Sequence, residues 1–291
     1  MWNQFLQPFD QMFEYIQPIC NYLKLPLLPG HIHEVFGALL FYQILYMYIG
    51  PRISTYLAPK TYPIFQGRSK LDWNIHIVSM TQATFISFLS QYVVLFDYER
   101  KRMTAQERAY GYTELSTTAL AIANGYFIWH FIMMTKHVNA YGWGMVAHAC
   151  ATNFLMIQGF RPAFLTYGVA SYLYEWSNIP LNIHRALGKL KMEKSKLYVF
   201  NGVTLFIVFF FCRIWWGTYL TWWFYKDIWN AYISPPPKGV EKLPTWLLFG
   251  HAIATTTLQS LNFVWFFLIA RILLSRVVYK KEKRWTSAKG E

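Results

Sequence analysis

The sequence predicts an all-α membrane protein, a polytopic bundle of about seven transmembrane helices. Hydrophobic residues make up 55% of the chain and charged residues only 14%, whereas about a quarter of the residues of a soluble domain are charged. Long apolar stretches recur along the chain, each close to the roughly 20 residues that a helix needs to cross a bilayer. Short polar segments separate them. This pattern is typical of a chain that folds back and forth through a membrane.

The expected helices follow one another with short connections. They cover residues 33–50, 75–96, 115–135, 143–159, 163–179, 197–222 and 246–273. The fourth and fifth are short, so they are tilted little, thin the bilayer locally, or pack inside the bundle away from lipid. The chain then divides into an interfacial segment 1–30, a first membrane helix with its cytosolic loop 31–70, a transmembrane core 71–279 and a basic cytosolic tail 280–291.

Two features precede or open the first span. Apolar residues recur with a helical period in 2–17, which predicts an amphipathic helix on the membrane surface or a helix that caps the bundle. His31, His33 and Glu34 follow. We interpret them as an interfacial polar cap and expect no metal, because no second His or Cys pair follows at ligand spacing.

The basic residues divide unevenly between the two predicted faces of the membrane. The net charge of +13 comes from 27 Lys and Arg against 14 Asp and Glu. Counting the loops places sixteen basic residues on the face of the C-terminus and nine on the other face. The richer face is expected to be cytosolic, which puts the N-terminus in the lumen. The expected partners are therefore membrane phospholipids and the anionic cytosolic leaflet, and no nucleic acid.

Three ionisable side chains within the central spans are the candidate site. His130 and His148 lie symmetrically about Asn139, so antiparallel helices joined by a tight turn bring them to one depth. Glu175 falls near the same depth, a few residues before a cytosolic loop. Such residues mark a functional site or a satisfied pair, and a hydrogen-bonded knot between the helices is the alternative. The full candidate polar cluster comprises His130, His148, Asn153, Glu175 and Asn178.

Two further polar residues within spans are assigned no site role. Arg213 lies near a cluster of tryptophans, and we expect it to snorkel to the lipid headgroups. His251 lies close to the lumenal end of the last span, apart in depth from the candidate cluster.

Three segments in order resemble one known family. They read RAYGYTELSTTALAIANGYFIWH, AHACATNFLMI and YLYEWSNIPLNIHRAL, and they are similar to the TLC-domain membrane proteins, which include ceramide synthases and translocon-associated TRAM proteins. The resemblance covers roughly 71–279 and is to the branch without an assigned synthase activity. It implies a helical bundle that encloses a cavity, an endoplasmic-reticulum membrane location, and work on lipids or acyl chains.

The chain departs from the ceramide synthase pattern at two points. Synthases carry a His-His pair where this chain has Ala147 and His148, and two aspartates where it has Glu175 and Asn178. The resemblance therefore implies a lipid-handling protein that binds, senses or rearranges membrane phospholipids, without ceramide synthase activity and without a cofactor.

Two alternatives stay open. The first is an acyltransferase that takes acyl-CoA as substrate, with His148 as general base and Glu175 orienting it. The second is a homodimer, built on faces of small residues, that shapes the membrane or escorts client proteins.

Overall fold

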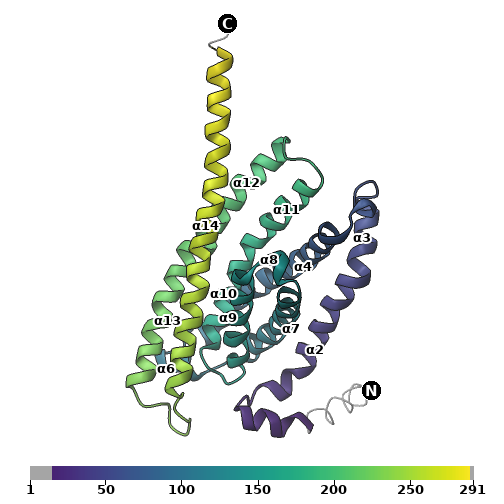
Figure 1. Cartoon of the computed structure of the whole chain (residues 1–291). Coiled ribbons are helices and arrows are strands. Elements are labelled where there is room, and N and C mark those ends of the chain that lie inside the picture. The colour runs from purple at the N-terminus through teal and green to yellow at the C-terminus, as the bar shows by residue number, and fades with distance from the viewer. Residues whose placement is uncertain (1–14, 289–291) are drawn as a thin grey trace.

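The structure, a computed structural model, describes residues 15–288, with side chains for 15–275. In this part the chain forms helices and no strand (Figure 1), which confirms the all-α prediction. Most of the predicted amphipathic helix 2–17 lies outside the described residues. The basic tail is helical as far as Ala288, because α14 (Thr245–Ala288) continues beyond the bundle as one projecting rod.

Four long helical segments have the length and hydropathy to cross a membrane. The first joins α2 (Leu28–Ile44), the π-helical turn η1 (Leu45–Ile49) and α3 (Gly50–Leu57). The second is α4 (Gly67–Phe96). The third joins α12 (Lys196–Phe209), the π-helical turn η4 (Phe210–Trp215) and α13 (Trp216–Ile233). The fourth is residues 245–275 of α14. The predicted number of seven spans is not confirmed by this criterion.

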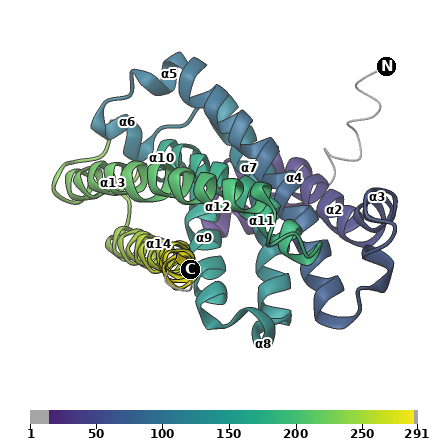
Figure 2. The ribbon, with the colours of Figure 1, turned by 90° about the horizontal axis from the view of Figure 1, so that it is seen from above.

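The three remaining predicted spans are helices that pack among the long ones. They are α7 (Glu114–Lys136), α9 (Trp143–Gly159), and α10 (Leu165–Ser171) with the 3-10 helix η3 (Tyr172–Ser177). Seen from above, α7 and α9 lie between α2 and α4 on one side and α13 and α14 on the other (Figure 2). α9 has 17 residues and α10 has 7, fewer than the roughly 20 that a span needs. α7 has 23 residues, but its apolar sequence is interrupted by polar side chains such as Asn124 and His130.

Short helices connect this framework at its two ends. They are η2 (Tyr62–Ile64), α5 (Tyr98–Lys101), α6 (Ala105–Tyr110), α8 (Val138–Tyr141) and α11 (Asn178–Lys189). In α6 a reciprocal cap forms: the Glu107 amide donates to Thr104 Oγ1 and the Thr104 amide donates to Glu107 Oε2. Such a cap satisfies two amides at the helix start.

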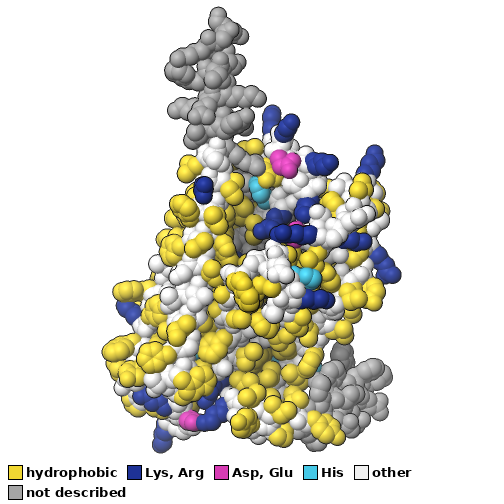
Figure 3. All heavy atoms as spheres, in the orientation of Figure 1, with side chains coloured by type: hydrophobic (Ala, Val, Ile, Leu, Met, Phe, Trp, Pro, Cys, Tyr) yellow, Lys and Arg dark blue, Asp and Glu magenta, His cyan; other side chains and the backbone are white. Residues whose placement is uncertain are grey.

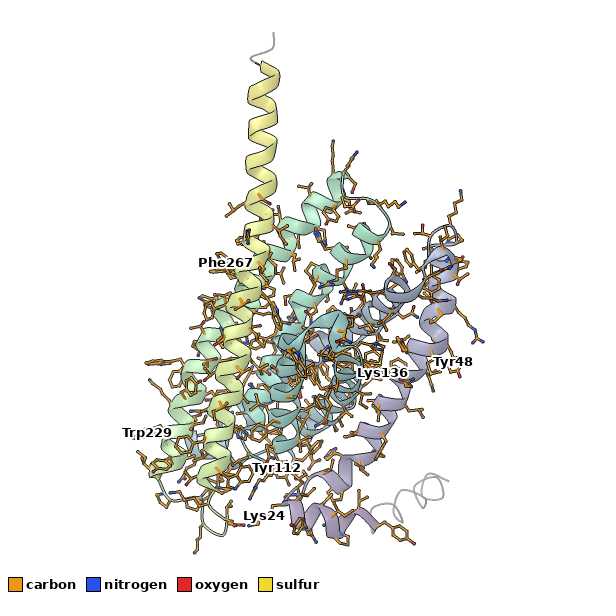
Figure 4. All side chains as sticks on the ribbon, in the orientation of Figure 1. Lys24, Tyr48, Tyr112, Lys136, Trp229 and Phe267 are labelled. Carbon is orange, nitrogen blue, oxygen red and sulfur yellow. The ribbon has the colours of Figure 1, made fainter. Side chains whose placement is uncertain are left out.

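The surface has the polarity expected of a protein embedded in lipid. Hydrophobic side chains cover the middle of the visible face, whereas Lys and Arg gather toward its upper and lower ends (Figure 3). Trp229 projects outward from α13 in the lower part of the view, where Lys24 also lies (Figure 4). Lys226 sits over the rings of Trp222 and Trp223, 5.2 and 4.8 Å from their centroids. Aromatic rings with a nearby cation are typical of a membrane interface. The protein is thus a multi-pass membrane protein.

Candidate functional site

A narrow cavity runs through the bundle between α7, α9, α10, η3, α13 and α14. Its volume is about 110 Å³. The residues that line it on α14 extend from His251 to Asn262, which is about 16 Å of helix rise at 1.5 Å per residue. We call this space the bundle cavity.

Polar and apolar side chains are segregated along the bundle cavity. His148, Glu175, Arg213, Gln259 and Asn262 line the end toward the C-terminal part of α14. Below them most of the walls are apolar, formed by Leu155, Met156, Leu165, Leu220, Phe224 and Leu258, and the hydroxyl groups of Thr152, Thr221 and Thr255 lie among them. The cavity therefore has a polar head and a long hydrophobic shaft.

Arg213 is the centre of the polar end. Its side chain is 6% exposed, so the prediction that it snorkels to the headgroups is wrong. Nε donates to Ser177 Oγ at 2.7 Å, and Nη1 donates to Asn262 Oδ1 at 3.0 Å. Arg213 belongs to the π-helical turn η4; such turns occur often at functional sites. Hydrogen bonds to protein groups stabilise the guanidinium inside the bundle, so the side chain does not need to reach water at the membrane surface.

Glu175 faces the same guanidinium from η3. Its Oε1 lies 3.8 Å from Arg213 Nη2, and its Oε2 accepts from Asn178 Nδ2 at 2.7 Å. Asn178 Oδ1 in turn accepts from Arg213 Nη2 at 3.2 Å. A 3-10 helix stacks residues i and i+3 on one face, which brings Glu175 and Asn178 together. The two opposite charges leave this end of the cavity close to neutral.

The two central histidines meet as their symmetric placement predicts. The rings of His130 and His148 lie 6.0 Å apart, centroid to centroid and edge to face, and His148 also contacts the ring of Trp265 at 5.3 Å. In the described part of the chain, Nδ1 of each histidine is buried without a hydrogen-bond partner. Only His148 lines the cavity; His130 lies behind it, stacked on Tyr126 at 5.8 Å.

The predicted cluster is thus brought together only in part. His148 and Glu175 line the bundle cavity, whereas His130, Asn153 and Asn178 do not. Asn153 donates to the carbonyls of Phe127 and Ala149, each at 2.9 Å, so it joins α9 to α7. No hydrogen bond within the described residues links Glu175 to His148. The site roles of these residues remain predictions.

The far end of the bundle cavity is closed by aromatic rings around His251. The imidazole is 1% exposed and lies 5.3 Å from the ring of Phe164 and 6.1 Å from that of Phe224. Phe164 adopts a left-handed backbone conformation, with φ of 57°, that turns the chain between α9 and α10. His251 therefore lines the same cavity as His148, at the opposite end of its α14 wall.

Comparison with known proteins identifies the family. The family model of the TLC domain matches residues 72–271 of this chain, which include every residue that lines the bundle cavity. The chain belongs to the TLC domain family. Of its relatives, an uncharacterized TLC domain-containing protein of Schizosaccharomyces pombe is 30% identical over 255 residues, covering 87% of this chain and 82% of the relative.

Two further relatives of this TLC domain protein are a yeast protein and a human protein. Topoisomerase I damage affected protein 4 of Saccharomyces cerevisiae is 25% identical over 253 residues, which is 84% of this chain and 85% of the relative. Human TLC domain-containing protein 4 is 24% identical over 249 residues, 84% and 89% of the two chains. These matches span nearly the whole chain, so the resemblance seen in the sequence is confirmed.

Sequence reasoning missed two residues of this TLC domain cavity. The tryptophans near Arg213 favour the membrane interface, although a lone arginine within a span is itself a signal of a polar interior. The position of His251 near the lumenal end of its span predicts a site separate from His148, because residue depth alone does not reveal a cavity that extends along the helix.

Proposed function

We propose that this protein binds one acyl chain of a membrane lipid in the bundle cavity and so binds, senses or rearranges phospholipids of the endoplasmic-reticulum membrane. The segregation of polar and apolar walls supports this proposal most strongly. Half of a hydrocarbon core of about 30 Å is about 15 Å, the depth of the chains of one leaflet. The α14 wall of the cavity has nearly that length.

The apolar shaft can accommodate a hydrocarbon chain but contributes little net affinity for it. Each buried methylene contributes about 0.8 kcal/mol relative to water, but a lipid chain leaves lipid rather than water, so this driving force largely cancels. Selectivity then comes from shape and from the polar end. A bound chain must leave its carbonyl or hydroxyl at the level of Arg213 and Asn262.

The polar end favours an uncharged group of the lipid. A guanidinium has five N–H donors, and three of them are used by Ser177, Asn262 and Asn178. The remaining donors are available to an ester or amide carbonyl. Because Glu175 already balances the charge of Arg213, a free carboxylate gains less there than a neutral acceptor.

The experiment compares two tryptophan substitutions on α14. Leu258 lines the bundle cavity, whereas Ile253 on the same helix is 67% exposed. We expect Leu258→Trp to fill the shaft and lose most of the lipid that co-purifies with the protein, measured by mass spectrometry of extracted lipids. Ile253→Trp should retain it. A photoactivatable fatty acid should crosslink to cavity residues in the unmodified protein and in Ile253→Trp, but not in Leu258→Trp. Equal lipid content in both variants, with unchanged melting temperatures, would contradict the proposal.

The second candidate function is acyl transfer from acyl-CoA, and the position of His148 favours it. This imidazole lines the cavity beside a second imidazole, His130, so a base could lie near a bound thioester. Glu175 is held by Asn178 and Arg213, which leaves the predicted orienting role unsupported. Labelled acyl-CoA should give product in liposomes with amine or alcohol acceptors. Activity equal to that of His148→Ala would end this candidate.

A further inference from the structure

A second cleft opens at the end of the bundle where the basic residues of the predicted cytosolic face gather. Its volume is about 290 Å³, and it lies between the N-terminal part of α4, the helix α11 and the start of α12. Its walls are Asp72, His76, His184, Arg185, Gly188, Lys189 and Tyr198. None of these lines the bundle cavity. We call it the α4–α11 cleft.

One wall of the cleft carries cations. Arg185 and Lys189 are four residues apart on α11, so they lie on one face of that helix. Arg185 is exposed and makes no hydrogen bond or ion pair with residues 15–275. Lys189 Nζ lies 3.4 Å from both Ser69 Oγ and Asp72 Oδ2, which is long for a charged hydrogen bond. Both cations can therefore turn to an anionic ligand.

The opposite wall carries an unused acceptor. Asp72 and His76 are four residues apart on α4, and Asp72 Oδ1 already accepts from Tyr141 at 2.7 Å. His76 Nδ1 lies 2.8 Å from Asn182 Oδ1, and Asn182 Nδ2 donates to Ser79 Oγ at 3.1 Å. The asparagine oxygen thus faces the imidazole, so Nδ1 carries the hydrogen. Nε2 of His76 is then an acceptor, and it is buried without a hydrogen-bond partner among the described side chains.

We propose that the α4–α11 cleft binds a phosphate group that carries a neighbouring N–H or O–H donor, as in the headgroup of an amine- or hydroxyl-bearing phospholipid. The phosphate binds Arg185 and Lys189, which form charge-assisted hydrogen bonds with such oxygens. The neighbouring donor binds Nε2 of His76. An unsatisfied buried acceptor is costly, so this second contact favours an ammonium or hydroxyl over a choline group, which has no N–H.

The proposal does not depend on acyl binding in the bundle cavity, because the two sites share no residue. Phosphate with an adjacent donor can come from a phospholipid or from a soluble ester, so the experiment includes both. Full-length protein in detergent is titrated with short-chain phosphatidylethanolamine, with phosphatidylcholine of the same chains, and with soluble phosphoethanolamine. Binding is followed by native mass spectrometry.

We expect phosphatidylethanolamine to bind more tightly than phosphatidylcholine. Arg185→Gln should weaken binding of both lipids by about tenfold, the loss of one charge-assisted hydrogen bond. Lys194→Gln is the matched control, because Lys194 is exposed in the loop after α11 and lies outside the cleft. His76→Phe should remove the preference for the ethanolamine lipid while leaving the binding of phosphatidylcholine unchanged. Melting temperatures show that each variant is folded.

The outcomes separate the sources and the rival explanations. Binding of phosphoethanolamine as tight as that of the lipid identifies a soluble ester as the ligand; weaker binding identifies the phospholipid. Equal weakening by Arg185→Gln and Lys194→Gln would mean general attraction to basic loops and would overturn the site. Equal affinity of the unmodified protein for the ethanolamine and choline lipids would overturn the donor contact at His76. That comparison needs no variant.

Discussion

Arg213 Nη2 lies 3.8 Å from Glu175 Oε1, and both side chains are almost completely buried in the centre of the bundle. Each partner also has protein hydrogen bonds, through Asn178 to both and through Ser177 and Asn262 to the arginine. The polar end of the bundle cavity is therefore a preassembled network. Its energetics can be tested before any ligand is known.

Arg213→Leu should lower the free energy of unfolding by about 3–5 kcal/mol, because it leaves the Glu175 carboxylate buried without its partner. The double variant Arg213→Leu with Glu175→Gln should recover part of this loss, since no charge remains inside. Thermal unfolding in detergent measures both. If the double variant lost more free energy of unfolding than the two single variants lose together, the interaction between Arg213 and Glu175 would not be the main one.

Gly125→Ala should destabilise the contact between α2 and α7. A Cβ at Gly125 would lie 2.4 Å from the carbonyl oxygen of Val35 and 2.6 Å from Cβ of Ala38. Overpacking of this kind costs about 1–3 kcal/mol. Gly144→Ala in α9 is the control, because nothing lies within 4 Å of a Cβ there, and it should not lower the melting temperature. Equal melting temperatures of Gly125→Ala and Gly144→Ala would mean that α2 can shift to accommodate the added methyl group.

Arg108→Met should destabilise the connection between α6 and α13. Arg108 Nε donates to Asp227 Oδ2 at 2.6 Å, and Tyr167 Oη donates to the same atom at 2.5 Å. Because Asp227 is fully buried, losing its cation should cost about 3–5 kcal/mol. Arg102→Met, at an exposed position between α5 and α6, should change stability by less than about 0.5 kcal/mol.

The loss of stability caused by Arg108→Met should be the same at neutral and at mildly alkaline pH. The hydrogen bond to Asp227 raises the pKa of the Arg108 guanidinium above its ordinary value. Stability from a raised pKa is present below the pKa of the unfolded state and is lost only as the pH rises through the folded value. For arginine, the pKa values of the unfolded and the folded state both lie far above pH 7. A difference in melting temperature that shrinks between neutral and mildly alkaline pH would contradict this assignment.

His251→Leu should raise the melting temperature slightly. Nδ1 of His251 lies 2.9 Å from the carbonyl oxygen of Leu247, while Nε2 is buried without a hydrogen-bond partner in the described structure. Removing an unsatisfied buried acceptor is stabilising by about 1 kcal/mol when an apolar side chain fills its space. A large loss of stability would instead show that a water molecule or a ligand binds Nε2 in the folded protein.

The sequence predicted those features that depend on local spacing. The contact of His130 with His148 follows from their equal distance to a tight turn, and the pairing of Glu175 with Asn178 follows from a separation of three residues. The inward direction of Arg213 depends instead on a π-helical turn and on three acceptors from two other segments. No local pattern encodes that convergence, and the bundle cavity arises from it.

Helix α14 forms one whole wall of the bundle cavity, yet only 6% of its most hydrophobic stretch is buried. Its opposite side faces the surrounding bilayer, so a single helix separates a chain bound in the cavity from the free lipids outside. Under the proposed function, the shortest path for a lipid chain into the cavity therefore passes beside α14. The headgroup need never leave its own leaflet, and lipid exchange would be a sideways step within the plane of the membrane.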